Sequence, residues 1–83
     1  MSEMNKPQHV IQELIASGVI QSVKAVPAAL AEGYNLFCYD KRSVVVAVLE
    51  AQRGEQRTFK TLDAVAVLVK KLGLKAFDVV IRT

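Results

Sequence analysis

The sequence predicts an α+β fold: an antiparallel sheet of four to five strands with two helices packed on one face, in the order α-β-β-β-β-α-β. Three observations lead to this prediction. Two segments carry apolar residues at helical spacing and end at a glycine, three consecutive extended segments are joined by tight turns, and an alternating segment follows the second helix. The 83 residues are expected to form one domain, 1–83.

The first helix is predicted over residues 7–17. Residues 1–6 are polar and are expected to be a disordered tail. Pro7 suits the first helical position, where its missing N–H costs nothing. An apolar stripe on one helix face follows, made of Val10, Ile11, Leu14 and Ile15. Gly18 is the expected stop.

Four extended segments are predicted next. Residues 19–26 form an imperfect alternation that ends at Pro27, which cannot donate to a ladder. Residues 34–40, 43–51 and 57–60 are the meander, with turns at 41–42 and 52–56. The segment 43–51 is apolar on both faces, which predicts a central strand covered on both sides, or covered on one side and used as an interface on the other.

The second helix has the clearest boundaries in the chain. Thr61 is the expected N-cap, and Asp63 in the first turn suits the helix dipole. Lys70 and Lys71 lie at the favourable end for cations, and Gly73 follows as the stop. Residues 77–82 then alternate with one apolar face, which predicts a closing strand.

The composition indicates self-association. It is 52% hydrophobic and 23% charged, which is more apolar than a small monomer needs, so a homodimer is expected. Val67 and Leu74 lie on the helix face opposite the core stripe. They are the candidate self-association residues, with a scattered surface valine as the alternative reading.

The basic residues are the candidate contacts for a charged partner. The net charge is +3, which permits nucleic-acid binding without requiring it. The candidates occupy two turns and the segment after the second turn: Lys41, Arg42, Arg53, Arg57 and Lys60. Three roles are possible for these residues: a solvated edge that opposes aggregation, contacts to nucleic-acid phosphates, or contacts to an acidic protein.

Enzymatic chemistry is not expected. His9 and Cys38 are the single histidine and the single cysteine, which is too few for a zinc site or a cysteine nucleophile with its base. The carboxylates are dispersed and the glycines are isolated, so no cofactor and no small-molecule substrate is predicted. The N-terminal residues lack an apolar signal region and the longest apolar run is too short for a membrane span, so a cytoplasmic protein is expected.

Both ends of the chain carry a family resemblance. The motif at 57–64, RTFKTLDA, together with Leu68, Leu72-Gly73 and Phe77-Asp78-Val79, resembles plasmid partition-associated proteins of the ParC type. The opening HVIQELIASGVIQSVKAV is similar to their usual start, whereas residues 27–52 match weakly. The resemblance implies an accessory role in plasmid maintenance with a ParA-like ATPase, centromere-like DNA or both as partners, and it brings no catalytic residues.

The sequence therefore leads to three hypotheses. The first is a non-enzymatic partition accessory protein that acts by protein–protein binding as a dimer. The second is a DNA-binding protein that uses the basic hairpin around Arg53–Lys60. The third is a small inhibitor or antitoxin-like protein.

Overall fold

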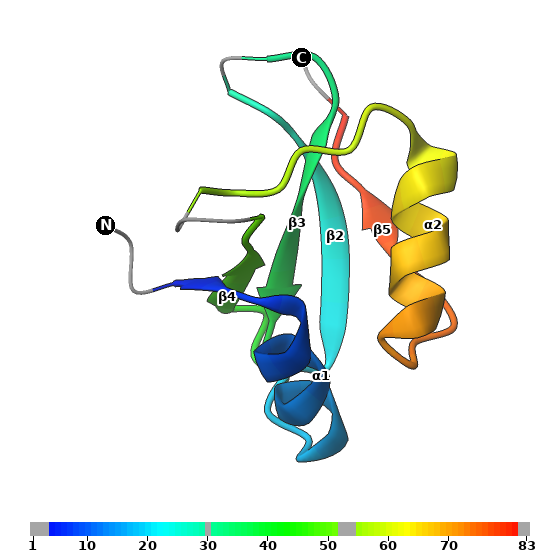
Figure 1. The fold of residues 1–83 in the computed structure, drawn as a ribbon. Coiled ribbons are helices and arrows are strands. Elements are labelled where there is room, and N and C mark those ends of the chain that lie inside the picture. The colour runs from blue at the N-terminus through cyan, green and yellow to red at the C-terminus, as the bar shows by residue number, and fades with distance from the viewer. Residues whose placement is uncertain (1–3, 30, 52–54, 82–83) are drawn as a thin grey trace.

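A computed structural model describes residues 4–29, 31–51 and 55–81, and it places two helices against one five-stranded sheet (Figure 1). The elements in chain order are β1 (Asn5–Lys6), α1 (Gln8–Ala16), β2 (Ser22–Pro27), β3 (Tyr34–Tyr39), β4 (Val45–Leu49), α2 (Leu62–Lys71) and β5 (Asp78–Val79). The predicted α+β class is confirmed.

The sheet is mixed, so the prediction of a fully antiparallel sheet is wrong. Its strand order is β1-β4-β3-β2-β5. The meander β2–β3–β4 is antiparallel, but β1 pairs parallel to β4 and β5 pairs parallel to β2. The parallel pairs arise because each terminal strand is connected to the sheet through a helix, and such a crossover returns the chain in the same direction.

A helical crossover connects each of the two outer strands to the central meander. The chain passes from β1 through α1 to β2, and later from β4 through α2 to β5. Each helix ends at a glycine with positive φ, 84° at Gly18 and 92° at Gly73, a conformation that side chains with a Cβ rarely adopt. The predicted stops at these two glycines are confirmed.

The predicted strand over residues 19–26 begins later, at Ser22. The backbone N–H groups of Val19 and Ile20 both donate to the carbonyl of Leu14, at 2.9 and 3.1 Å. These bonds satisfy a free carbonyl at the end of α1, so the two residues cap the helix instead of extending the strand.

Two other segments also differ from the sequence prediction. Asn5 and Lys6 belong to strand β1 rather than to a tail, while residues 1–3 lie outside the described part. Residues 57–60 are not a strand: an isolated bridge joins Phe59 to Tyr34, and a second one joins the preceding Gln56 to Glu50. The real order among the described residues is therefore β-α-β-β-β-α-β.

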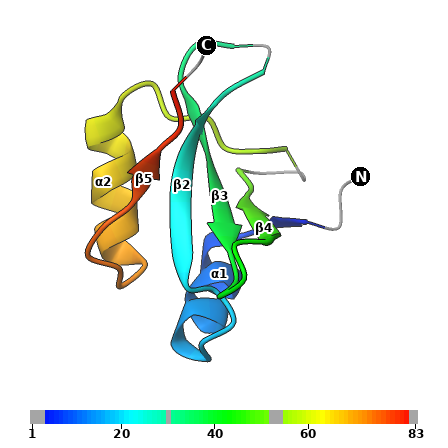
Figure 2. The ribbon, with the colours of Figure 1, turned by 180° about the vertical axis from the view of Figure 1, so that it is seen from behind.

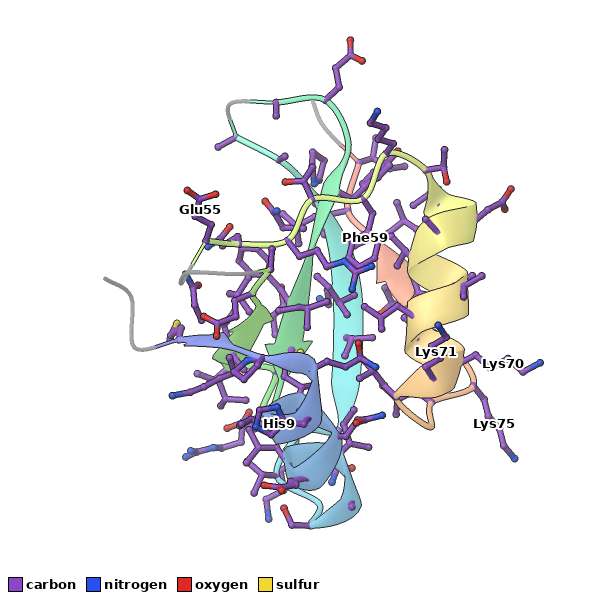
Figure 3. All side chains as sticks on the ribbon, viewed as in Figure 1. His9, Glu55, Phe59, Lys70, Lys71 and Lys75 are labelled. Atoms are coloured by element: carbon purple, nitrogen blue, oxygen red, sulfur yellow. The ribbon has the colours of Figure 1, made fainter. Side chains whose placement is uncertain are left out.

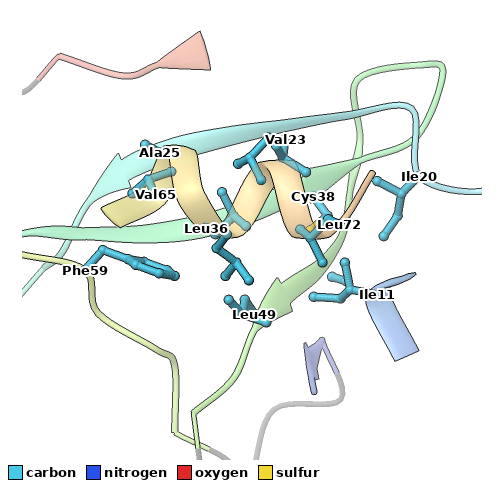
Figure 4. Close-up of a cluster of buried hydrophobic side chains, with 13 residues drawn as sticks. Ile11, Ile20, Val23, Ala25, Leu36, Cys38, Leu49, Phe59, Val65 and Leu72 are labelled. Carbon is cyan, nitrogen blue, oxygen red and sulfur yellow. The ribbon is translucent and has the colours of Figure 1, made fainter. Parts of the chain in front are cut away.

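The core lies between the sheet and the helices (Figure 4). Alternate residues of the three central strands point into it: Val23, Ala25, Leu36, Cys38, Ala47 and Leu49. Ile11 from α1 and Val65, Leu68 and Val69 from α2 close the same cluster, so both helices cover one face as predicted.

Phe59 covers one end of this core from residues 55–61, which lead into α2 and which we call the crossing segment. Its side chain is buried, and its backbone exchanges two hydrogen bonds with Tyr34, at 2.7 and 2.8 Å. Asn35 supports the same segment by donating its side-chain amide to the carbonyl of Arg57 at 2.9 Å. Phe59 thus covers the part of the core that the predicted strand over residues 57–60 would have covered.

Candidate functional site

The sheet face turned away from the helices is the candidate binding surface. We call it the open face. It consists of half-buried residues that alternate with the core residues along the central strands: Lys24 and Val26 of β2, Phe37 and Tyr39 of β3, and Val45 of β4. Val48 of β4 belongs to the same side of the sheet but is only 3% exposed. In Figure 2, which looks onto this face, none of the described helices lies over it.

The open face is apolar and aromatic rather than polar. Phe37 stands opposite Lys24 on one side and Val48 on the other, and Tyr39 stands opposite Val45. A bulge between Cys38 and Tyr39 in the β3–β4 pairing brings Val45 opposite Tyr39. A sheet face exposed to water usually carries polar side chains, so this composition indicates a contact surface.

Lys24 is the cation of the open face. Its Nζ lies 4.8 Å from the centroid of the Tyr39 ring, within the range of a cation–π interaction. On its other side, Lys24 is the register partner of Asp78 on β5. The lysine therefore holds its charge over the Tyr39 ring, where a carboxylate or phosphate of a partner would be attracted.

The candidate basic residues do not form one patch. Lys41 and Arg42 are exposed in the β3–β4 turn, where Arg42 approaches Asp40 with 3.7 Å between Nη2 and Oδ2. Lys60 lies next to Phe59, which pairs with the start of β3. The six residues of β3 separate the two places by roughly 17 Å.

The remaining basic candidates lie in or near the crossing segment. Arg57 is exposed, and its guanidinium lies 4.7 Å from the centroid of the Phe59 ring. The predicted position of Arg53 falls outside the described residues. Figure 3 shows further cations that sequence reasoning did not propose as partner contacts: Lys70 and Lys75 project from the end of α2 and from the loop after it.

The two self-association candidates occupy different surroundings. Val67 on α2 has 57% of its surface exposed, as its position opposite the core stripe predicted. Leu74 is half-buried and packs against the core cluster, because the turn at Gly73 folds it back toward the sheet. The structure therefore does not join the two residues into one surface.

Cys38 and His9 differ in their exposure to solvent. Cys38 is 0% exposed in the core, and burial raises the pKa of its thiol to about 12. His9 is exposed at the start of α1. Among the described residues, no group of three or more His, Cys, Asp or Glu side chains could hold a metal ion.

Neither described helix reaches the length of an apolar membrane span, for which about 20 residues are needed. α1 has nine residues and α2 has ten.

No family model matches the sequence, and neither a curated protein nor a solved structure is significantly similar to the chain.

Sequence reasoning missed the open face because it depends on strand register. The segment 34–40 was recognised as extended, and its alternation already separates Phe37 and Tyr39 from Leu36 and Cys38. Which of these pairs faces the helices follows from tertiary packing and is not visible in the alternation itself. The double-sided apolar character of β4 was the available signal, and one of its two readings was a sheet face used as an interface.

Proposed function

We propose that this chain is a non-enzymatic accessory protein of plasmid partition that acts by protein–protein binding, as a homodimer, with a ParA-like ATPase as its partner. The open face carries the proposal. It offers Phe37 and Tyr39 beside Lys24 on the central strands of the sheet, and none of its residues belongs to the core cluster. Aromatic side chains flanked by a cation are typical of protein contact surfaces. The assignment to partition comes from the resemblance at 57–64 and around Gly73.

The test is co-purification of a ParA-like ATPase with the tagged chain. We expect the wild-type chain to retain the ATPase. The double substitution Phe37→Thr and Tyr39→Thr removes both rings while keeping residues that favour strands, so it should abolish retention. Val19→Thr, a change at an exposed valine after α1 that belongs to no candidate site, is the control and should leave retention unchanged.

Two results would overturn the proposal. One is a wild-type chain that fails to retain the ATPase under conditions where the folded state is verified by circular dichroism. The other is equal retention by the wild type and by the double variant, since binding would then not use the open face.

DNA binding is the second candidate. It is supported by the net charge of +3 and by the exposure of Arg57 and Lys60 three residues apart on the crossing segment. The double variant Arg57→Ala and Lys60→Ala should weaken binding to labelled duplex DNA at low salt, and raising the salt should weaken the wild type in the same way. Absence of binding by the wild type at low salt would reject this candidate.

A further inference from the structure

The loop that returns the chain from α2 to β5 forms a wall of two neighbouring hollows. Residues 74–77 line both of them. One hollow, of about 380 Å³, lies between this loop and α2, and the other, of about 300 Å³, lies between the loop and the start of β2. Every residue that lines them belongs to the described part of the chain, so the structure places the walls of both.

The hollow beside α2, which we call the α2 groove, has an apolar floor and a basic rim. Its apolar lining consists of Ala66, Val69, Leu74, Ala76 and Phe77. Val69 belongs to the core cluster, and Leu74 and Phe77 pack against it, so the floor is continuous with the core. Lys70 and Lys75 complete the lining, and both are exposed. In Figure 3 these two lysines project into solvent on the same side of the molecule.

The charge of this surface has one sign. Residues 66–77 contain Lys70, Lys71 and Lys75 and no acidic residue, so this stretch alone carries a charge of +3, equal to the net charge of the whole chain. Among the described residues, the one ion pair that forms joins Asp40 to an arginine in the β3–β4 turn, so no described carboxylate neutralises the three lysines. The acidic residue that follows, Asp78, lines the other hollow.

The lysines are not needed as hydrogen-bond donors to the end of α2. The carbonyls of residues 68–71 all accept a hydrogen bond from another group. Three donors are the backbone N–H groups of Leu72, Gly73 and Leu74, at 2.9, 3.0 and 3.2 Å. The fourth is the side-chain amide of Gln12, at 3.1 Å from the carbonyl oxygen of Lys71. Lysines near a helix end often bond such carbonyls, but here these positions are taken, which leaves the ammonium groups to a partner.

We propose that the α2 groove binds an acidic segment of a partner protein. One large apolar side chain of the segment occupies the hollow, and carboxylates on both sides of it meet Lys70 and Lys75. The volume is at the lower end of the range of about 300–1,000 Å³ that bound ligands occupy, which suits a single side chain. Burial of that side chain supplies affinity, and the charges supply orientation and specificity. The groove is a different surface from the open face, so this inference stands independently of the proposed function.

Two other occupants fit the α2 groove less well. The carboxylates of this chain are dispersed and its net charge is +3, so a second copy offers no acidic segment to the lysines. Nucleic acid offers phosphates to the rim but no apolar side chain to the floor, which would stay in contact with water. An acidic protein segment complements both parts of the groove.

The experiment is an NMR titration of the full chain with the synthetic peptide acetyl-Glu-Asp-Phe-Asp-Glu-amide, followed through the backbone amide signals. The peptide should move the amides of residues 66–77 in a saturable way, with a dissociation constant of about 0.5 mM or below. Replacing its phenylalanine by serine should raise the dissociation constant about tenfold or more, because the apolar burial is lost. Replacing its acidic residues by their amides should raise it by a similar factor of about ten.

Variants of the chain test the rim and the floor separately. Lys70→Glu and Lys75→Glu should each raise the dissociation constant about threefold or more, because each turns an attraction into a repulsion. Ala66→Leu adds a larger side chain to the lining at an exposed helical position, so it should raise the constant about threefold or more without changing the charge. Lys6→Glu is the matched control: it makes the same change in net charge on β1, at the opposite edge of the sheet, and should alter the constant by less than about twofold. Circular dichroism of each variant verifies the fold.

The outcomes separate this groove from other sites. Failure of the peptide at about 5 mM to move the amides of residues 66–77 overturns the groove as a binding site. Shifts centred on Phe37 and Tyr39 would place the peptide on the open face and overturn it as well. Equal weakening by Lys6→Glu and Lys70→Glu would reduce the attraction to net charge and overturn the role of the rim. Tighter binding of duplex DNA than of the peptide at the same amides would overturn the acidic protein segment as the occupant. Retention of the ATPase by the open face has its own test, so neither result decides the other.

Discussion

Replacement of Gly33 by alanine is predicted to be the most destabilising glycine substitution in the described part of the chain. Gly33 has φ of 107°, and a Cβ at this position would overlap the backbone carbonyl oxygen of Phe59 and approach its carbonyl carbon to 3.1 Å. The obstacle is backbone, so no side-chain rotation relieves it. The same carbonyl oxygen accepts the hydrogen bond from the N–H of Tyr34 at 2.8 Å.

The size of the effect follows from two contributions. Positive φ costs an alanine about 1–3 kcal/mol wherever it occurs. Moving Phe59 away from Tyr34 would also break the two hydrogen bonds between them, each worth about 1 kcal/mol, and would loosen the buried Phe59 ring. We therefore expect Gly33→Ala to cost about 3–5 kcal/mol, a large share of the stability of a domain this small.

Gly73→Ala is the matched control. Gly73 has φ of 92°, and a Cβ there would meet nothing within 4 Å, so this variant carries the conformational cost alone. Urea unfolding followed by circular dichroism at 222 nm measures both free energies of unfolding. We expect Gly33→Ala to be less stable than Gly73→Ala by about 2 kcal/mol or more. A difference of less than about 0.5 kcal/mol would refute the close approach of the crossing segment to Gly33.

Three further predictions concern single side chains. Thr61→Ala removes the 3.1 Å hydrogen bond that the N–H of Ala64 donates to the threonine Oγ1, and it should lower the free energy of unfolding by about 1 kcal/mol. Thr61→Ser keeps a hydroxyl at this position and should retain most of this stability, so equal urea midpoints for the two variants would contradict the cap. Burial raises the pKa of Cys38 from 9.0 to about 12, so its contribution to stability is present below pH 9 and is lost as the pH rises toward 12. Urea midpoints should therefore fall less steeply between these pH values for Cys38→Ala than for the wild type, and identical slopes would count against the burial. The backbone N–H of Val44 holds the pKa of Asp40 below its usual value of 3.8, so the wild type should lose stability relative to Asp40→Asn as the pH falls through and below that range, and parallel acid-unfolding curves would be inconsistent with the turn.

The sequence predicts α2 well because all its boundary signals are local. Thr61 accepts the expected hydrogen bond from Ala64, Asp63 lies in the first turn, and Gly73 has positive φ. Each of these features depends on residues within one helical turn, so the pattern alone determines it.

The outer strands and the crossing segment were harder to predict because they depend on distant partners. Strand β1 has two residues, and its hydrogen bonds come from β4, more than 40 positions later in the chain. Residues 57–60 have strand propensity, but the segment is held by one isolated bridge to Tyr34 and by the side chain of Asn35, so no ladder forms. Short segments are decided by tertiary contacts, which override propensity.

The candidate site was predictable only in part. The exposure of Val67 on α2 followed from its helical position. The open face required the register of β3 with β2 and β4, since that register brings Lys24 beside Tyr39. The α2 groove required the course of residues 74–77 back to β5, which no sequence pattern encodes.

The shortness of the two parallel strands has a consequence for motion. β1 and β5 each pair with their neighbour over two residues, whereas β2 and β3 pair over six. Breaking two residue pairs costs far less than unfolding the meander, so both margins of the sheet can detach while the centre stays intact. Amide hydrogen exchange should therefore be much faster at Val80 than in β3.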